Sequence, residues 1–345
     1  AGDERRPLGG VRPRPFFSAL KPRIAIFSGE NSAQAADVAA AVEAKGGDAL
    51  VFDISLGDDT AVTLKPGGGS WQGNDFADIA AIHIRCTAPN TMPSLPPLLN
   101  AASFAEQRLE FVREQSYQAT TYAFFEHLSG QGKLVVNRLT QGFTDHNSKA
   151  QLFQKLRRWQ VGVPETISTN DPGTAAAFVE RHGEVVAKPA IGVGSTRLVD
   201  DHDRARLAEV ALCPVLLQRF VRGQTLRLHV VGDKVVLPLE IDTQGHVDSR
   251  TAPTDFRFAA LDRRHRKDVV RATRLLGLHY AAWDAIVGAN DGRLYLLDCN
   301  PGPSLMWIGP DFREIVCRGL AGYLVAWALS GSLQKARAAV EAWSP

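Results

Sequence analysis

Two aspartates near the carboxyl end of the chain lie on apolar segments that are separated by a turn. The segments are residues 280–287 and 293–300, and the sequence Ala-Asn-Asp-Gly lies between them. Turn residues between two apolar runs predict a β-hairpin. Paired outward from the turn, Asp284 and Asp298 come within one residue of facing each other, and Asn300 shares a face with Asp298.

Opposed carboxylates on apolar strands are unfavourable, because each is desolvated and each repels the other. A divalent cation removes that cost. Two carboxylates and an amide oxygen suit magnesium, which takes few protein oxygens and completes its shell with water and phosphate. Asp284, Asp298 and Asn300 are therefore the predicted metal ligands. The alternative is that both aspartates simply point to solvent.

A second candidate is a predicted strand, residues 184–188, that ends in a lysine and runs into a glycine-bearing loop. Lys188 can neutralise phosphate oxygens, and the small residues Gly192, Gly194 and Ser195 let backbone amides approach them. The loop has neither the spacing of a P-loop nor that of a dinucleotide-binding turn, so an ordinary turn is the alternative.

A third candidate is the apolar strand at residues 215–220, which leaves the amide of Gln218 beside a turn. An amide at such a hinge can read the edge of an adenine. Exposed strand positions are also commonly glutamine, so this residue has a structural interpretation as well.

The amino-terminal part alternates strands and helices as a parallel sheet with crossover helices does. The expected elements are a strand at 24–28, a helix at 33–44, strands at 49–53 and 78–85, a helix at 104–129 and a strand at 134–137. Loops are expected at Gly67–Ser70 and at 88–97. The Arg- and Pro-rich residues 1–20 are expected to be disordered, which leaves residues 21–140 as an α/β domain.

Two further units are expected, a small α+β module at residues 141–222 and an antiparallel module at 223–345. The first contains helices at 149–159 and 174–182 and strands at 184–188 and 215–220. The second contains a hairpin of runs 226–231 and 234–241 joined by Gly-Asp, a basic helix at 262–276, the carboxylate hairpin and a last helix at 315–329.

Composition excludes several classes of protein. Lys and Arg total 39 against 37 for Asp and Glu, so no charge excess predicts binding to nucleic acid or an anionic membrane. The four cysteines form no CxxC pair, so neither a zinc site nor a disulfide framework is indicated. No apolar run approaches the roughly 20 residues of a membrane span. A soluble cytoplasmic protein is expected.

The order of these features resembles the ATP-grasp superfamily over about residues 140–330. The resemblance implies that Lys149 and Lys188 contact the nucleotide, and that Arg227 meets the γ-phosphate or an acyl phosphate. It also implies an ATP-grasp fold of mixed α/β and α+β class, with an N-terminal α/β domain, a small central lid module and a C-terminal antiparallel-sheet module. The implied nucleotide-binding residues are Lys149, Lys188, Gly192, Gly194, Ser195, Gln218, Arg219 and Phe220.

Finer motifs resemble the RimK-like branch, and especially the graspetide, or microviridin-type, peptide macrocyclases. They are Pro-Glu-Thr-Ile-Ser-Thr-Asn-Asp-Pro at 164–172, Glu-Ile-Asp-Thr-Gln at 240–244 and Asp-Phe-Arg at 255–257. In this family Glu usually stands where this chain has Asp298, and Trp where it has Phe256. Arg257, like Arg227, would then contact the substrate.

The resemblance implies a ligase that uses ATP and two magnesium ions, with Arg227 and Lys188 as catalytic residues. Its substrate would be a ribosomal precursor peptide, held through a leader segment, in which Asp or Glu side chains are joined to Thr, Ser or Lys. A homodimer is compatible with the sequence. Two alternatives are a ligase that adds a free amino acid to a peptide or metabolite and a non-catalytic nucleotide- or peptide-binding regulator.

Overall fold

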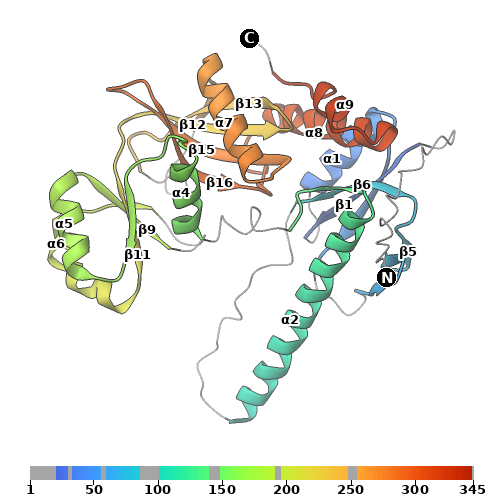
Figure 1. The fold of residues 1–345 in the computed structure, drawn as a ribbon, viewed down its shortest axis with the longest axis horizontal. Coiled ribbons are helices and arrows are strands. Elements are labelled where there is room, and N and C mark those ends of the chain that lie inside the picture. The colour runs from blue at the N-terminus through green and yellow to red at the C-terminus, as the bar shows by residue number, and fades with distance from the viewer. Residues whose placement is uncertain are drawn as a thin grey trace, which may run out of the picture.

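The computed structural model describes residues 21–29, 33–55, 60–85, 101–139, 148–190, 196–247 and 255–343, and Figure 1 shows their arrangement. These residues form one parallel sheet and three antiparallel sheets. The expected mixture of α/β and α+β structure is therefore confirmed. The predicted arm at 1–20 and the predicted loop at 88–97 lie outside the described residues.

The parallel sheet, sheet A, has its apolar strands buried on both faces. On β1, Ile24 and Ile26 pack against helix α1, while Ala25 and Phe27 pack into an aromatic core with helix α2. Burial on both faces is typical of a parallel sheet with crossover helices, and it explains the continuous apolar run. The strand order is β2-β1-β6-β7. The elements are β1 (Arg23–Ser28), α1 (Ala33–Ala44), β2 (Asp48–Asp53), β6 (Ile79–Ile84), α2 (Ala101–Gly130) and β7 (Leu134–Val136).

The predicted loop at Gly67–Ser70 is wrong. A small antiparallel sheet lies there, formed by β3 (Val62–Lys65), β4 (Gly68–Trp71) and β5 (Asn74–Asp75). The glycine run misled the prediction because glycine normally weakens a strand. At Gly69 a side chain would lie 2.8 Å from the ring of Phe124, so close packing against α2 requires glycine in this strand.

In the second antiparallel sheet, sheet C, one face is covered by helix α5. Helix α5 packs on Val185 and Leu217, and Asp171 caps that helix by accepting a hydrogen bond from the backbone N of Thr174 at 2.7 Å. The alternate residues of these strands, among them Lys188 and Gln218, lie on the opposite face and are buried as well. Sheet C has the order β10-β9-β11-β8. Its elements are β8 (Thr166–Thr169), α5 (Pro172–His182), β9 (Val185–Pro189), β10 (Arg197–Leu198), α6 (Asp201–Ala205), the 3₁₀ helix η2 (Leu207–Leu212) and β11 (Val215–Arg219).

The third antiparallel sheet, sheet D, confirms both predicted hairpins. Val231 pairs with Lys234 around a two-residue turn, in which Gly232 has a φ of +56°. That positive φ is why glycine stands at the first turn position. The strand order is β14-β13-β12-β15-β16. The elements are β12 (Gly223–Val231), β13 (Lys234–Asp242), β14 (Asp255–Phe258), α7 (Arg263–Leu275), β15 (Tyr280–Gly288) and β16 (Leu294–Asn300).

The two faces of sheet D are covered by different parts of the chain. Helix α7 and helix α4 (Lys149–Arg158) cover the face that carries Leu226 and Trp283. Helix α8 (Pro310–Ser330) packs on the other face and also on α1, so sheets A and D share one core. Figure 1 shows α8 and the unpredicted short helix α9 (Leu333–Ala338) beside α1. The amino-terminal and carboxyl-terminal parts are thus joined by buried apolar contacts.

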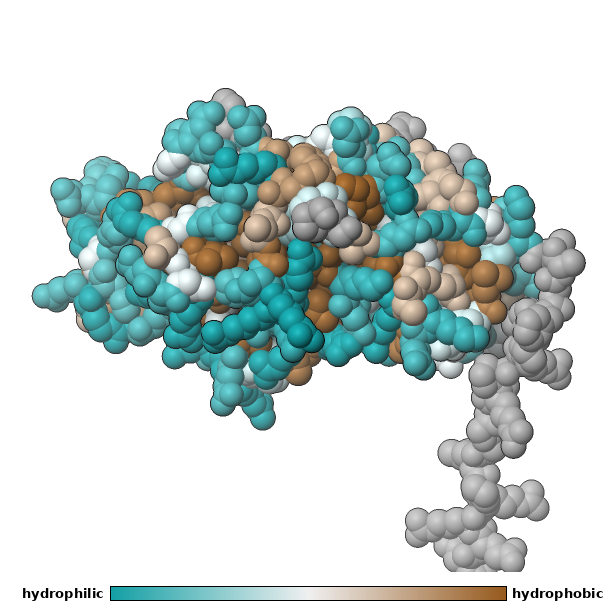
Figure 2. Space-filling view, turned by 90° about the horizontal axis from the view of Figure 1, so that it is seen from above, coloured by the Kyte–Doolittle hydropathy of each residue, from teal (hydrophilic) through white to brown (hydrophobic). Residues whose placement is uncertain are grey.

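Within the described part of the chain, no helix is both long enough and apolar enough to cross a bilayer. The side of the molecule shown in Figure 2 is mostly hydrophilic, with hydrophobic residues showing between the polar ones.

Two basic side chains of helix α7 bind other elements at the surface. Its Arg271 donates to the carbonyl of Trp159 at 2.6 Å, and its Arg274 forms an ion pair with Asp233.

Candidate functional site

The hairpin of β15 and β16 brings the two predicted metal-binding aspartates face to face. Asp284 pairs directly with Asp298, and Asn300 pairs with Ala282. Cross-strand partners share a face of a sheet, as do residues two apart in a strand. All three oxygen-bearing side chains therefore lie on the same face of sheet D.

A β-bulge accounts for the one-residue difference from the predicted register. The predicted closing pair is present, since the backbone N of Gly288 donates to the carbonyl of Arg293 at 2.9 Å. Regular pairing from that point would place Leu297 opposite Asp284. The register shifts between Asp284 and Ala285, so that Asp298 takes this position. One extra residue on β16 thus aligns the carboxylates.

Each carboxylate of the facing pair is bonded to a cation from another element. Lys149, the first residue of α4, donates from Nζ to Oδ2 of Asp298 at 2.5 Å. Arg227 on β12 donates from Nη1 to Oδ1 of Asp284 at 2.7 Å. The two adjacent carboxylates, Asp298 and Asp284, are therefore flanked by one cation on each side, Lys149 and Arg227. These two positive charges offset the repulsion between the carboxylates.

Arg227 is fixed on several sides. Its side chain is 6% exposed, and its Cζ lies 5.2 Å from the centre of the Trp307 ring. Nε of Arg227 is buried without a hydrogen-bond partner. His229, two residues along β12, is completely buried, and burial, followed by the charge of Arg227, lowers its pKa well below the usual value. His229 is consequently neutral and adds no charge beside the guanidinium.

The donor set fits magnesium. Within the described parts of the chain, no three His, Cys, Asp or Glu side chains form a cluster that could hold a metal ion. Two carboxylates and an amide oxygen are hard ligands, and magnesium normally fills the rest of its octahedral shell with water and phosphate oxygens. The side chains of Asp284 and Asp298 are 37% and 24% exposed, so solvent reaches both carboxylates.

A second polar cluster lies on the face of sheet C opposite helix α5. Nζ of Lys188 donates to Oε1 of Gln218 at 2.9 Å, and Nε2 of Gln218 donates to Oγ1 of Thr166 at 2.9 Å. Gln218 is only 1% exposed. In this structure its amide therefore holds Lys188 in place. Reading of an adenine edge by Gln218 stays a prediction.

The backbone N–H groups of the two residues after Gln218 are also hydrogen-bonded within the protein. The N–H of Arg219 donates to Glu165 and the N–H of Phe220 donates to Glu184, both to carbonyl oxygens. The predicted adenine contacts of Arg219 and Phe220 stay predictions. Gly192, Gly194 and Ser195 lie outside the described residues.

Arg257 does not join Arg227 in this arrangement. It pairs across β13 and β14 with Glu240, whose carboxylate it binds, and this hydrogen bond lowers the pKa of Glu240. Leu239, the cross-strand partner of Arg227, lies one residue from Glu240. Adjacent strand residues point to opposite faces, so Arg257 and Arg227 are on different faces of sheet D. The substrate-binding role of Arg257 stays a prediction.

The family comparison agrees with this geometry. Residues 146–303, which contain sheets C and D with both polar clusters, match the model of the ATP-grasp domain. The chain contains an ATP-grasp domain. The predicted resemblance to that superfamily is confirmed.

A curated relative and several solved structures are similar to this chain. The relative is the "probable alpha-L-glutamate ligase" of Rhodopirellula baltica, 26% identical over 180 residues. The match covers 47% of this chain and 43% of the relative, so the chain aligns with less than half of that protein.

Solved ATP-grasp structures align over nearly the whole chain. The ligase PsnB complexed with minimal precursor, Mg and ADP has a TM-score of 0.76 and 23% identity, covering 90% of this chain and 99% of that chain. The macrocyclase MdnC from Microcystis aeruginosa, bound with its precursor peptide MdnA, has a TM-score of 0.68 and 20% identity, covering 88% and 99%. These likenesses show the fold, an ATP-grasp module behind an amino-terminal α/β domain. The boundaries at 140 and 222 stay predictions.

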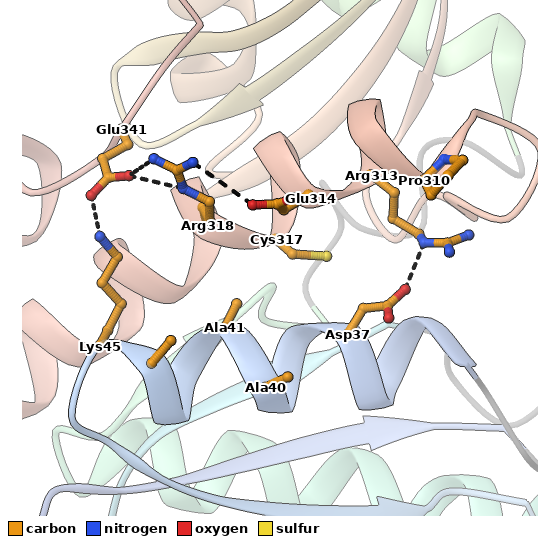
Figure 3. Close-up of a pocket in the computed structure, with 11 residues that line it drawn as sticks. Asp37, Ala40, Ala41, Lys45, Pro310, Arg313, Glu314, Cys317, Arg318 and Glu341 are labelled. Carbon is orange, nitrogen blue, oxygen red and sulfur yellow. Dashed lines mark hydrogen bonds and ion pairs between the residues drawn. The ribbon is translucent and has the colours of Figure 1, made fainter.

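A groove of about 630 Å³ lies between α1 and α8 and is lined by residues outside the matched range 146–303 (Figure 3). Its charged side chains are paired with one another. Lys45 and Arg318 both bind Glu341, and Arg313 binds Asp37. Alanines of α1 form much of its floor. These charged groups already neutralise one another, so little charge is left to bind an ionic ligand. The ion pair of Arg313 with Asp37 instead connects α8 to α1.

One residue near the site had no predicted role. Asn137, just after β7, is completely buried, and its Nδ2 donates to the carbonyls of Tyr280 and Pro301, both at 2.6 Å. Its Oδ1 accepts from the backbone N–H groups of His279 and Tyr280. Asn137 thus holds together the open end of the carboxylate hairpin. A single Asn after an apolar strand gives no sequence signal for this role.

Proposed function

We propose that this protein is an ADP-forming, ATP-dependent carboxylate ligase. It activates a carboxylate as an acyl phosphate and transfers the acyl group to a hydroxyl or an amine. The observation that supports this proposal best is the row of Lys149, Asp298, Asp284 and Arg227 within the ATP-grasp domain, in which two facing carboxylates are flanked by two cations. Such a row offers oxygen ligands for a cation and positive charges for phosphate.

The proposed ligands of magnesium are Asp284, Asp298 and Asn300, and two ions are expected. Bound magnesium would neutralise charge on the phosphate oxygens of ATP. If Asp284 and Asp298 held magnesium, Lys149 and Arg227 would be released from these ion pairs. Both cations could then bind phosphate oxygens, which are negatively charged like the carboxylates.

The proposed catalytic residues are Arg227 and Lys188. An oxygen of the substrate carboxylate attacks the γ-phosphorus, the bond to the ADP oxygen breaks, and Arg227 and Lys188 offset the charge on the transferred phosphoryl oxygens. The acceptor hydroxyl or amine then attacks the carbonyl carbon, and phosphate leaves. Because Gln218 fixes the Nζ of Lys188 at 2.9 Å, this cation is held ready before the nucleotide binds.

The active acyl phosphate must be protected from water. The segment that contains Gly192, Gly194 and Ser195 is the proposed lid over the phosphates. It joins β9, which carries Lys188, to β10.

The proposed substrate is a ribosomal precursor peptide whose Asp or Glu side chains are joined to its own Thr, Ser or Lys. The solved structures of PsnB and MdnC, which share this fold along 99% of their chains, are complexes with precursor peptides. A leader segment of such a peptide and Arg257 would contribute to binding. A second candidate, addition of a free amino acid, is favoured by the curated relative named as a probable alpha-L-glutamate ligase.

Mass spectrometry separates the two reactions. Purified protein is incubated with ATP, magnesium and the acidic peptide encoded nearest to its gene, with and without free glutamate, while ADP release is followed. Cross-linking lowers the peptide mass by one water per link, whereas addition of an amino acid raises it. ATP binding without ADP release under any of these conditions would favour the non-catalytic regulator instead.

A further inference from the structure

An aromatic residue beside the proposed reactive arginine is open to solvent. Trp307 stacks on Arg227 with a Cζ to ring-centre distance of 5.2 Å, and its ring lies 5.1 Å from that of Phe256. Despite these contacts Trp307 remains 40% exposed, and its neighbour Met306 is 48% exposed. Large apolar side chains with this much exposure stand next to a guanidinium that is almost fully buried.

The exposure of Trp307 does not come from a loose segment. Its Nε1 donates to the carbonyl of Ser304 at 2.7 Å, and the flanking Leu305 and Ile308 are 1% and 3% exposed. The backbone N of Leu305 is also bonded to the side chain of Gln34 on α1 at 2.8 Å. The sheet face and α1 thus fix the position of the indole.

The open part of this surface has little polar character. The indole N–H is the one polar donor of Trp307, and Ser304 already occupies it. The sulfur of Met306, a weak acceptor, lies 3.6 Å from Nη1 of Arg313. The atoms left for a partner are carbon atoms and the π surface. An apolar or aromatic side chain is therefore the complementary partner.

We propose that Trp307 and Met306 form a specificity surface for an apolar residue that flanks the reacting acid of the peptide. This inference rests on the proposed function, because it places the reacting carboxylate at Arg227. An extended peptide rises about 3.3 Å per residue, so a side chain one or two positions from that acid reaches a ring located beside the guanidinium. The surface is continuous with the proposed reaction site and shares its arginine.

The test uses matched synthetic peptides that contain one Glu and one Thr separated by glycines, with Phe, Leu or Gly directly before the Glu. Their kcat/KM for ADP release is measured with the full-length protein and with Trp307→Ala, Trp307→Phe and Met306→Ala. Leu64→Ala in β3 is the control, because Leu64 is 39% exposed and lies in a different sheet.

The natural protein is expected to prefer the Phe and Leu peptides over the Gly peptide by about tenfold, mainly through KM, as is usual for one apolar contact. Trp307→Ala should remove the preference, Trp307→Phe should keep most of it, and Leu64→Ala should not change it. An equal decrease with all three peptides would mean that Trp307 only supports Arg227, and would overturn the inference.

Peptide binding provides a readout that does not need turnover. Fluorescence anisotropy of labelled peptides should show tighter binding of the Phe peptide to the natural protein than to Trp307→Ala. Tight binding of Phe and Gly peptides alike would overturn the inference while leaving the ligase proposal intact. Absence of both ADP release and peptide binding would overturn both. Dissociation of an oligomer by Trp307→Ala, seen by sedimentation without any peptide preference, would assign the surface to a second copy and also overturn it.

Discussion

Asp284 and Asp298 are directly opposed on β15 and β16, and each is bound to a cation from a different element, Arg227 on β12 and Lys149 on α4. The pair therefore couples sheet D to the helix that leads into sheet C. A metal ion that draws the carboxylates together would at the same time release both cations toward phosphate. This exchange of partners underlies the first prediction.

Replacing Asp298 with Asn should abolish most magnesium-dependent turnover. The amide is a poorer ligand, and a decrease of about 100-fold in kcat is expected for the loss of one such electrostatic contact. The substitution also leaves Lys149 without its counter-charge, so the free energy of unfolding should fall by about 1–2 kcal/mol. ADP release against magnesium concentration and urea unfolding measure the two effects. Asp201→Asn is the control, because Asp201 is fully exposed; magnesium dependence in Asp298→Asn equal to that of the control would contradict the metal site.

Gln218→Leu should weaken ATP binding. It removes the acceptor that holds Nζ of Lys188 and leaves Thr166 without its donor. A single misplaced charged hydrogen bond of about 1.4 kcal/mol raises KM for ATP about tenfold. Steady-state kinetics with varied ATP test this, with Gln154→Leu on the exposed side of α4 as control. If KM stays constant while stability falls, Gln218 is a core residue without a role in nucleotide binding.

Asn137→Ala should destabilise the whole protein. The buried amide makes four hydrogen bonds that join the segment after β7 to both ends of the carboxylate hairpin. Leaving these backbone groups unpaired should cost about 2–4 kcal/mol. Guanidinium unfolding should show a lower midpoint with an unchanged slope, whereas Asn74→Ala in the exposed strand β5 should change little. A loss of stability no larger than that of the Asn74 variant would show that Asn137 does not hold the hairpin in place.

Acid should destabilise the protein between pH 6.5 and about 4. Burial lowers the pKa of both His83 and His279 from 6.5 to about 4. In this window the unfolded chain binds protons that the folded chain does not, so the free energy of unfolding falls as pH falls. Each histidine contributes on the order of 3 kcal/mol over the window.

The variant His83→Gln isolates one of these contributions. Its free energy of unfolding should depend less steeply on pH between 6.5 and 4 than that of the natural protein, whatever its absolute stability. Urea unfolding at several pH values gives the two slopes. Parallel slopes would show that the His83 pKa is the same in the folded and unfolded states.

Local sequence patterns determined most elements. The strand of β1, helices α1 and α5 and both hairpins of sheet D follow from apolar periodicity, a capping Asp171 and glycine at turns, all of which act over a few residues. The same patterns put Asp298 and Asn300 on one face and brought Asp284 within one residue of facing Asp298, because the turn sets the register of the first pairs of the hairpin. Glycine-containing β4 was missed, because its packing partner Phe124 lies far along the chain.

Tertiary structure alone decided how the polar residues are paired. Four features depend on neighbouring strands and helices. They are the bulge that aligns the two aspartates, the bond of Lys149 to Asp298, the hydrogen bond of Lys188 to Gln218 and the separation of Arg257 from Arg227. None of these contacts can be predicted from the local helix or strand propensity of the residues. The sequence determines which polar groups are present and to which face of a strand each one points. Which groups pair is decided by the free energy of burying charges that are distant in the chain.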